Sequence, residues 1–161
     1  MTWEEVCADP NLQELPYKVE TDRFGRIVMS PTHNRHSINQ SAVMSWLQRQ
    51  RPDWVVAVEF AIETGGGVKV PDVIAMPPER HPTVGNDAAC PLAPDVCVEV
   101  LSRSNDPAEI AEKRGLLAAK GCVEFWVCAL DGTMTFQDAA TGQSLARSRL
   151  FPQFPASVLR R

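Results

Sequence analysis

Two carboxylates stand in segments that otherwise consist of apolar, strand-forming residues. Asp72 lies in the run VPDVIAM (residues 70–76), and Glu99 lies in the run DVCVEVL (residues 95–101). A carboxylate is costly to bury without a partner. If both side chains point to the same side of neighbouring strands, their oxygens form the hard ligand set that Mg²⁺ or Mn²⁺ prefers, and the cation offsets their burial and mutual repulsion. The alternative is structural: an Asp that caps the loop before its strand, and a Glu that pairs with Arg or Lys across the sheet.

The elements that would position these carboxylates follow from hydrophobic periodicity and turn residues. Strands are predicted over residues 54–62, 69–76, 95–101 and 123–129. Helices are predicted over residues 34–50 and 106–120. Pro at the first turn and Gly just past the end are typical of the boundaries of the second helix.

Hairpins and a loop complete the predicted architecture. Residues 17–30 predict a hairpin at the amino-terminal side, and Asp131-Gly132 predicts another between the strand 123–129 and residues 133–138. Residues 77–94 are rich in Pro, Gly, Asn and Asp, which is typical of a mobile surface loop.

The first helix has a predicted cap and a predicted core stripe. Asn34 or Ser37 could cap its amino terminus. The expected buried residues, at the spacing of an amphipathic helix, are Ile38, Ala42, Val43, Trp46 and Leu47.

The composition is that of one soluble α/β domain over residues 1–161, with residues 1–14 as a loosely ordered amino-terminal segment. Its 161 residues are 44% apolar and 22% charged, which is ordinary for a globular chain. There is no apolar run of roughly 20 residues and no secretory signal pattern, so we expect a cytoplasmic protein without a membrane partner. The net charge of −4 gives no global signature of nucleic-acid binding, but a nuclease needs only a local basic rim.

Five cysteines argue against a disulfide framework and against a structural zinc site, because their number is odd and no CxxC pair occurs. Cys97, Cys122 and Cys128 lie in apolar runs and are expected to be buried. The chain has no GxSxG elbow, which argues against a serine hydrolase.

Three spaced motifs resemble one known family. The segments PDV (residues 71–73), PDVCVEVLSRS (94–104) and EKRGLLAAKGCVEFWV (112–127) are similar to the Uma-two family of restriction endonucleases, within the PD-(D/E)XK nuclease superfamily. Residues 17–36 resemble the family's amino-terminal hairpin, its Ser-Pro pair and the His that follows. The resemblance extends over roughly residues 15–155 and implies a restriction-endonuclease-like α/β fold, a central mixed β-sheet flanked by helices with an additional N-terminal hairpin.

The resemblance also implies a metal site. Asp72 corresponds to the superfamily's metal-binding Asp and Glu99 to its second acidic ligand, and the backbone carbonyl of Val100 would complete the site. The superfamily's usual Lys, two positions after the acidic residue, is replaced here by Leu101. In the Uma-two subgroup the basic residue comes from the following helix, where this chain has Lys113.

Several matched positions keep an alternative interpretation. Lys113 could merely pair with Glu109 at i, i+4. Glu20 could be a third catalytic carboxylate or an exposed strand charge. His36 could contact phosphate or be an ordinary polar surface residue, and Glu59 could line the same cavity without any motif to support it.

Two groups of residues near the site have predicted supporting roles. Ser102 and Ser104 are expected to cap the helix that begins near Asp106. Candidates for a phosphate-contacting rim are Arg35, Lys69, Arg80, Arg103 and Arg114.

The implied function is a Mg²⁺-dependent endonuclease, with Mn²⁺ as a substitute, that hydrolyses DNA phosphodiester bonds. Its catalytic residues would be Asp72, Glu99, Lys113 and Glu20. Cutting a duplex needs two such sites, so a homodimer is expected. The alternative is a catalytically inactive domain of the same fold that acts as a binding or interaction module. The acidic balance and Leu101 favour that alternative, and metal binding would distinguish the two.

Overall fold

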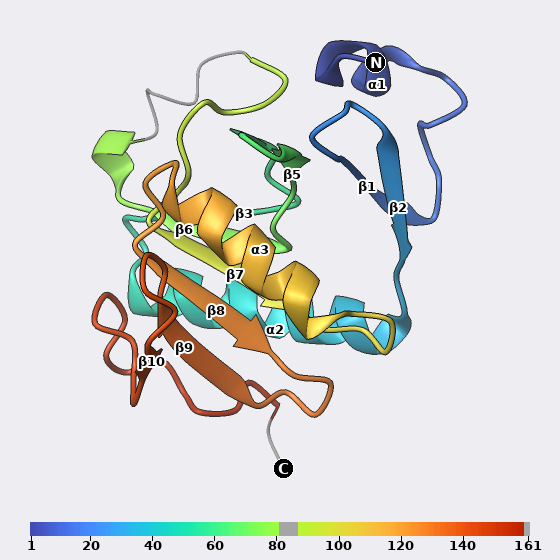
Figure 1. Ribbon diagram of the computed structural model, residues 1–161. Coiled ribbons are helices and arrows are strands. Elements are labelled where there is room, and N and C mark those ends of the chain that lie inside the picture. Colours follow the sequence, from blue (N-terminus) through green and yellow to red (C-terminus); the bar gives the residue numbers. More distant parts are fainter. Residues whose placement is uncertain (81–86, 160–161) are drawn as a thin grey trace.

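A six-stranded mixed β-sheet forms the centre of the protein (Figure 1). The computed structural model describes residues 1–80 and 87–159. The strands lie in the order β10-β9-β8-β7-β6-β3; β7 and β8 are parallel, and the other neighbours are antiparallel. Their bounds are Val55–Val58 (β3), Val73–Met76 (β6), Val96–Val100 (β7), Glu124–Cys128 (β8), Met134–Asp138 (β9) and Ser144–Leu145 (β10).

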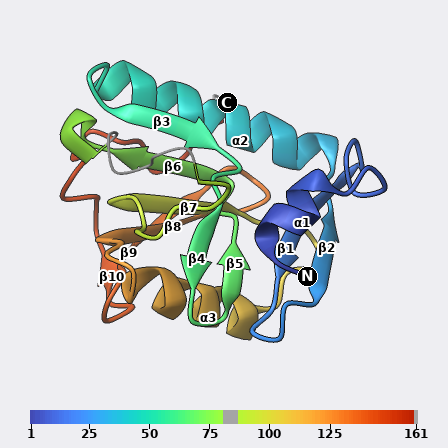
Figure 2. The ribbon, with the colours of Figure 1, turned by 90° about the horizontal axis from the view of Figure 1, so that it is seen from above.

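Two helices cover opposite faces of this sheet (Figure 2). Helix α2 (Asn34–Gln50) lies along one face and contacts β3, β6 and β7. Helix α3 (Pro107–Ala118) connects β7 to β8 and covers the other face. In the part of the chain that the structure describes, no helix is long and apolar enough to cross a bilayer.

The side chains of β7 alternate between the face of the sheet that α2 covers and the face that α3 covers. Its even-numbered valines join a hydrophobic cluster with Val43 and Leu47 of α2, whereas Cys97 joins a cluster with Leu117 of α3. Because successive strand residues point to opposite faces, Glu99 lies on the same face as Cys97. The strand therefore directs this carboxylate towards α3.

Two short hairpins stand beside the central sheet. The amino-terminal one pairs β1 (Tyr17–Thr21) with β2 (Ile27–Pro31), and the other pairs β4 (Ile62–Thr64) with β5 (Gly67–Lys69). The Thr21 hydroxyl accepts a hydrogen bond from the Val68 amide at 2.8 Å, which ties the hairpins together. At Gly67, with φ of 92°, a Cβ atom would collide with the backbone oxygens of Thr21 and Asp22. The close approach of the hairpins thus requires glycine there.

Most of the predicted elements are confirmed, but two predicted strands are each divided. Residues 54–62 form β3 and then, after a break, the start of β4. The break falls at Glu59, whose φ of 51° is left-handed and ends the pairing with β6. Residues 69–76 likewise contain the end of β5 and all of β6, so Asp72 precedes β6 rather than lying in mid-strand.

Two expectations about the start of α2 are wrong. His33 is the N-cap residue and makes no side-chain capping bond, so neither Asn34 nor Ser37 has that role. Ile38 is 53% exposed. The buried residues of the helix are His36, Asn39, Val43 and Leu47. The predicted burial of Val43 and Leu47 is confirmed, and Ala42 and Trp46 pack against the same cluster, so only Ile38 was wrongly included in the stripe. Two of the four buried residues are polar, and apolar periodicity does not select such residues.

The remaining predictions outside the site have mixed outcomes. Asp106 caps α3 by accepting a hydrogen bond from the Ala108 amide, and the expected capping by Ser102 and Ser104 is wrong. The predicted burial of Cys97, Cys122 and Cys128 is confirmed. In the predicted loop 77–94, residues 81–86 lie outside the described residues, and Cys90 forms a β-bridge with Ile62. A short helix, α1 (Trp3–Ala8), occupies the amino-terminal segment, where the sequence predicted no element.

Candidate active site

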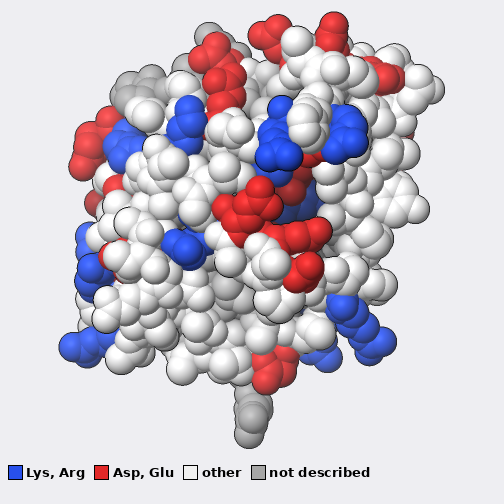
Figure 3. Space-filling model, in the orientation of Figure 1, with Lys and Arg blue, Asp and Glu red and all other residues white. Residues whose placement is uncertain are grey.

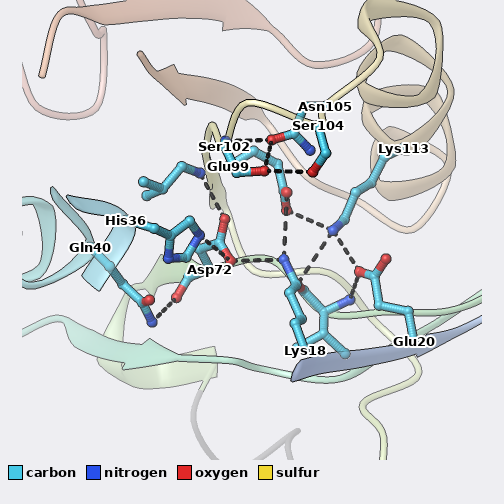
Figure 4. Close-up of polar contacts among 12 residues, drawn as sticks. Lys18, Glu20, His36, Gln40, Asp72, Glu99, Ser102, Ser104, Asn105 and Lys113 are labelled. Atoms are coloured by element: carbon cyan, nitrogen blue, oxygen red, sulfur yellow. Dashed lines mark hydrogen bonds and ion pairs between the residues drawn. The ribbon is translucent and has the colours of Figure 1, made fainter. Parts of the chain in front are cut away.

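A pocket of about 400 Å³ opens between the β1–β2 hairpin, the start of α2 and the amino-terminal half of α3. Its floor is formed at the junction of β6 and β7, where the Asp72 amide donates a hydrogen bond to the Val98 carbonyl at 3.0 Å. This bond extends the pairing of the two strands by one step, and it brings Asp72 beside Glu99 on the face covered by α3. The side chains that line this floor converge on one another (Figure 4).

Asp72 is 1% exposed and is contacted from three directions. Its Oδ1 lies 2.8 Å from the Lys18 Nζ and 3.4 Å from the His36 Nε2. Its Oδ2 accepts a hydrogen bond from the Val100 amide at 2.7 Å, and its backbone carbonyl accepts one from the Gln40 Nε2 at 3.1 Å. The carboxylate is therefore held rigidly at the amino-terminal end of β6.

Glu99 and Glu20 share the ammonium group of Lys113. The Lys113 Nζ lies 2.7 Å from the Glu99 Oε1 and 2.6 Å from the Glu20 Oε1. Glu20 also accepts a hydrogen bond from the Val70 amide at 2.7 Å. The other oxygen of Glu99, Oε2, lies 3.5 Å from the Lys18 Nζ. Carboxylates and ammonium groups thus alternate along the floor of the pocket.

The charges of this cluster shift the protonation equilibria of its members. Burial acts to raise the pKa of Asp72, but the Lys18 ammonium and His36 outweigh it and hold that pKa well below its usual range. Burial acts to lower the pKa of Lys18, but Glu99 and Asp72 outweigh it, so that pKa is raised. For Glu99 burial prevails, and its pKa is raised although Lys113 and Lys18 oppose the shift. An additional cation at the floor of the pocket would oppose the upward shift of the Glu99 pKa.

The donor set fits a hard divalent cation. Asp72 and Glu99 already share one cation, the Lys18 ammonium, and their oxygens are ligands that Mg²⁺ and Mn²⁺ prefer. The Glu99 Oε1 is buried and receives no directed hydrogen bond from the described residues despite its close ion pair with Lys113. Within residues 1–80 and 87–159, no group of three or more His, Cys, Asp or Glu side chains forms a ready metal cage. A metal here would therefore rely on these two carboxylates and on backbone or water oxygens.

The structure brings together the four predicted catalytic residues and Val100. Asp72, Glu99, Lys113 and Glu20 meet at the floor of the pocket, and Val100 lines the same pocket. Lys113 is 7% exposed and pairs with Glu20 and Glu99, so the alternative that it merely pairs with Glu109 is wrong.

The other predicted positions divide into those near the site and those away from it. His36 is buried beside Asp72, so it is not an ordinary surface residue. Glu59 is exposed and lines a different, smaller pocket. Its predicted place in the same cavity is wrong.

The expected phosphate-contacting rim stays a prediction. Of its five candidates, only Lys69 lines the described pocket. Arg80 lies 3.4 Å from Asp95, and the Arg114 guanidinium donates a hydrogen bond to the Ala139 carbonyl. Arg35 and Arg103 are exposed and are not among the residues that line the described pocket.

Sequence reasoning missed the residue that is most central to the cluster. Lys18 contacts both Asp72 and Glu99, and no motif singled it out. A signal was present, since Lys18 and Glu20 are two apart in a strand and must therefore point to the same side. Gln40 was also missed, together with three residues at the hairpin turn that line the pocket: Arg23, Phe24 and Arg26.

Comparisons with known proteins agree with the fold that the resemblance implied. A sequence model of the Uma2 (Uma-two) family, described as "Putative restriction endonuclease", matches residues 3–138. The crystal structure of "a putative nuclease belonging to DUF820" from Anabaena variabilis ATCC 29413 superimposes with a TM-score of 0.76 and 18% sequence identity, over 98% of this chain and 95% of that one. No curated protein matches the chain in sequence at a significant level. The predicted restriction-endonuclease-like α/β fold is thereby confirmed.

Proposed function

The chain belongs to the Uma2 family, and from this premise we propose that it is a Mg²⁺-dependent endonuclease that hydrolyses phosphodiester bonds of DNA. The observation that carries the proposal is the convergence of Asp72, Glu99 and Lys113 at the floor of one pocket. Asp72 and Glu99 would hold Mg²⁺, or Mn²⁺ in its place, with the carbonyl of Val100. When bound, such a cation lowers the pKa of a water molecule and polarises a phosphate oxygen.

Lys113 supplies a charged donor beside those carboxylates. Its ammonium is fixed between Glu20 and Glu99 at 2.6 and 2.7 Å, and it lies 3.4 Å from the Val70 carbonyl. Exchanging the weak contact with Val70 for a phosphate oxygen would let Lys113 stabilise charge that develops on the phosphate. Glu20 acts as a positioning residue, because it fixes this ammonium from the side opposite Glu99.

A second candidate function is a catalytically inactive domain that acts as a binding or interaction module. One observation favours it: the carboxylates are already paired with protein cations, and the Lys18 ammonium occupies the position between Asp72 and Glu99. In that case Lys18 is a permanent structural counter-ion. In the nuclease, by contrast, Lys18 must move aside when a divalent cation binds. The two functions therefore predict different effects of removing Lys18 on metal affinity.

Lys18→Met is expected to tighten Mn²⁺ binding by at least about tenfold in the nuclease. The substitution removes a competing positive charge, and two unit charges about 4 Å apart interact by roughly 4 kcal/mol at an effective dielectric constant of 20. Isothermal titration calorimetry measures the affinity. Lys69→Met is the matched control, because Lys69 lines the same pocket but donates to the Thr21 carbonyl rather than contacting Asp72 or Glu99. An equal change in both variants would mean that net charge alone is responsible.

Metal removal tests the activity itself. Supercoiled plasmid is expected to be nicked in Mg²⁺ or Mn²⁺ and left intact in excess EDTA, with activity restored when Mg²⁺ is added back. The metal-free protein should stay folded, because Lys18 and Lys113 already compensate the buried carboxylates. Nicking that continues at the same rate in EDTA would contradict metal dependence. We also propose a homodimer, because two copies of the site are needed wherever both strands of a locally opened DNA are cut.

A further inference from the structure

The turn of the β1–β2 hairpin presents an aromatic ring to solvent. Phe24 is 65% exposed, more than any other large apolar side chain among the described residues. The turn that carries it is well braced: the Asp22 Oδ1 accepts hydrogen bonds from the amides of Phe24 at 2.8 Å and Arg26 at 3.0 Å. Gly25 takes a φ of 72°, which closes the turn without strain. The ring is thus held outward by a fixed backbone.

Two arginines flank this ring. The guanidinium carbons of Arg23 and Arg26 lie 4.7 and 5.0 Å from the centre of the Phe24 ring. Arg26 is also paired with Asp22 at 2.8 Å, whereas Arg23 makes no ion pair within the described residues. The turn therefore combines a largely exposed aromatic side chain with a positive charge that protein carboxylates do not neutralise. Both guanidinium groups lie over the ring, so another ring that stacks on Phe24 would displace one of them.

These turn residues belong to the rim of the candidate active site. Phe24, Arg23 and Arg26 line the same pocket as Asp72 and Glu99. Figure 3 shows basic side chains above a hollow in the surface and acidic side chains below and beside it. The carboxylates Glu109 and Glu112 of α3 line the pocket on its other wall. A polyanion entering the pocket would be repelled by the α3 wall and attracted by the hairpin wall.

We propose that the β1–β2 turn binds an unpaired base of the DNA strand next to the scissile phosphate, with Phe24 stacking on the base and Arg23 contacting the adjoining phosphate. The inference rests on the proposed nuclease function and names its substrate class: single-stranded or locally opened DNA. A paired base in a duplex has both faces covered by its neighbours and offers no face to Phe24. Stacking on an aromatic side chain is independent of base identity and is typical of single-strand binding without sequence preference.

The test compares binding of single strands and duplexes by Phe24→Leu and Phe24→Tyr. Fluorescence anisotropy with a labelled single-stranded oligonucleotide in EDTA separates binding from cleavage. Stacking on an aromatic side chain is worth about 1–3 kcal/mol per base, so Phe24→Leu is expected to weaken single-strand binding by about 5- to 150-fold. Phe24→Tyr should retain wild-type affinity because it keeps the ring. Blunt duplex should bind more weakly to the wild type and be unaffected by either variant.

The outcomes separate this inference from the proposed function. Equal binding by Phe24→Leu and wild type, or wild-type protein that prefers duplex, would overturn the base site even if plasmid nicking persists. Loss of single-strand binding in Phe24→Leu would support the base site even if no metal-dependent nicking occurs. Ile38→Ala is the control for loss of exposed apolar surface, because Ile38 is exposed on α2 and is not part of the described pocket lining. Tighter binding of an RNA strand of the same sequence would contradict the assignment to DNA.

Discussion

Asp72→Asn is expected to reduce plasmid nicking by at least about 10³-fold. Metal-ion catalysis contributes several kcal/mol of transition-state stabilisation, and each 1.36 kcal/mol is a factor of ten in rate. Asparagine keeps the shape of the side chain, and its amide oxygen can still accept the hydrogen bond that the Asp72 Oδ2 accepts from Val100. What the variant loses is the charge opposite Lys18 and any metal held there. The nicking rate in Mg²⁺ measures this effect.

The control for this variant is another ion-paired Asp, which lies outside the pocket. Asp138 lies on β9, and its hydrogen bond with Arg149 is the main cause that lowers its pKa to about 2. Asp138→Asn removes an ion-paired charge without touching the cluster, and it should leave nicking within about twofold of wild type, as is usual for a surface substitution away from the site. Thermal unfolding of both variants establishes that they are folded. Nicking at the wild-type rate by folded Asp72→Asn would show that this carboxylate is not catalytic.

Lys113→Met is expected to lower the nicking rate by about 10²–10³-fold while Mn²⁺ binding is retained. The magnitude is that of removing one donor which stabilises charge in a transition state. The same change leaves Glu20 and Glu99 without the ammonium they share, and breaking a buried ion pair costs about 3–5 kcal/mol of folding free energy. The variant should therefore unfold at a clearly lower temperature, and nicking must be measured well below that temperature.

A double variant separates catalysis from stability. In Glu20→Gln/Lys113→Met, one of the two carboxylates that lost their ammonium partner is replaced by a neutral amide. Part of the lost thermal stability should therefore return. Nicking should stay as low as in Lys113→Met, because the donor is still absent. If nicking recovers together with stability, Lys113 is a structural counter-ion and its catalytic role is contradicted.

The two acidic ligand candidates could be predicted because their signal is local. Glu99 is a carboxylate in a continuous apolar strand. Because successive residues of β7 point to opposite faces, its position in the strand determines the face on which it lies. Asp72 was identified by the same pattern, although the predicted strand 69–76 is longer than β6. The left-handed conformation at Glu59 and the break before β6 depend on how the β4–β5 hairpin leaves the central sheet, which no periodicity in the sequence encodes.

Lys18 could not be placed because its role depends on long-range docking. Lys18 is 54 residues from Asp72 along the chain, and they meet only after the β1–β2 hairpin packs against β5. The burial of two polar residues of α2 was also not predicted: His36 was named as a candidate without any expectation of burial, and Asn39 was not named, because burial normally selects apolar residues. The Asn39 side chain donates to the carbonyls of Ala129 and Leu130, while His36 lies against Asp72. Burial of a polar side chain marked the site here, and sequence alone did not show it.

The most direct test of the central claim is a calorimetric titration of Mn²⁺ into the wild-type protein and into Asp72→Asn. The account predicts saturable binding at one site per chain in the wild type and its loss in the variant, because Asp72 and Glu99 are the proposed ligands. No heat of binding in the wild type, or equal binding in both proteins, would contradict a metal site at these carboxylates. The pocket would then be a neutralised cluster in which Lys18 and Lys113 are permanent counter-ions.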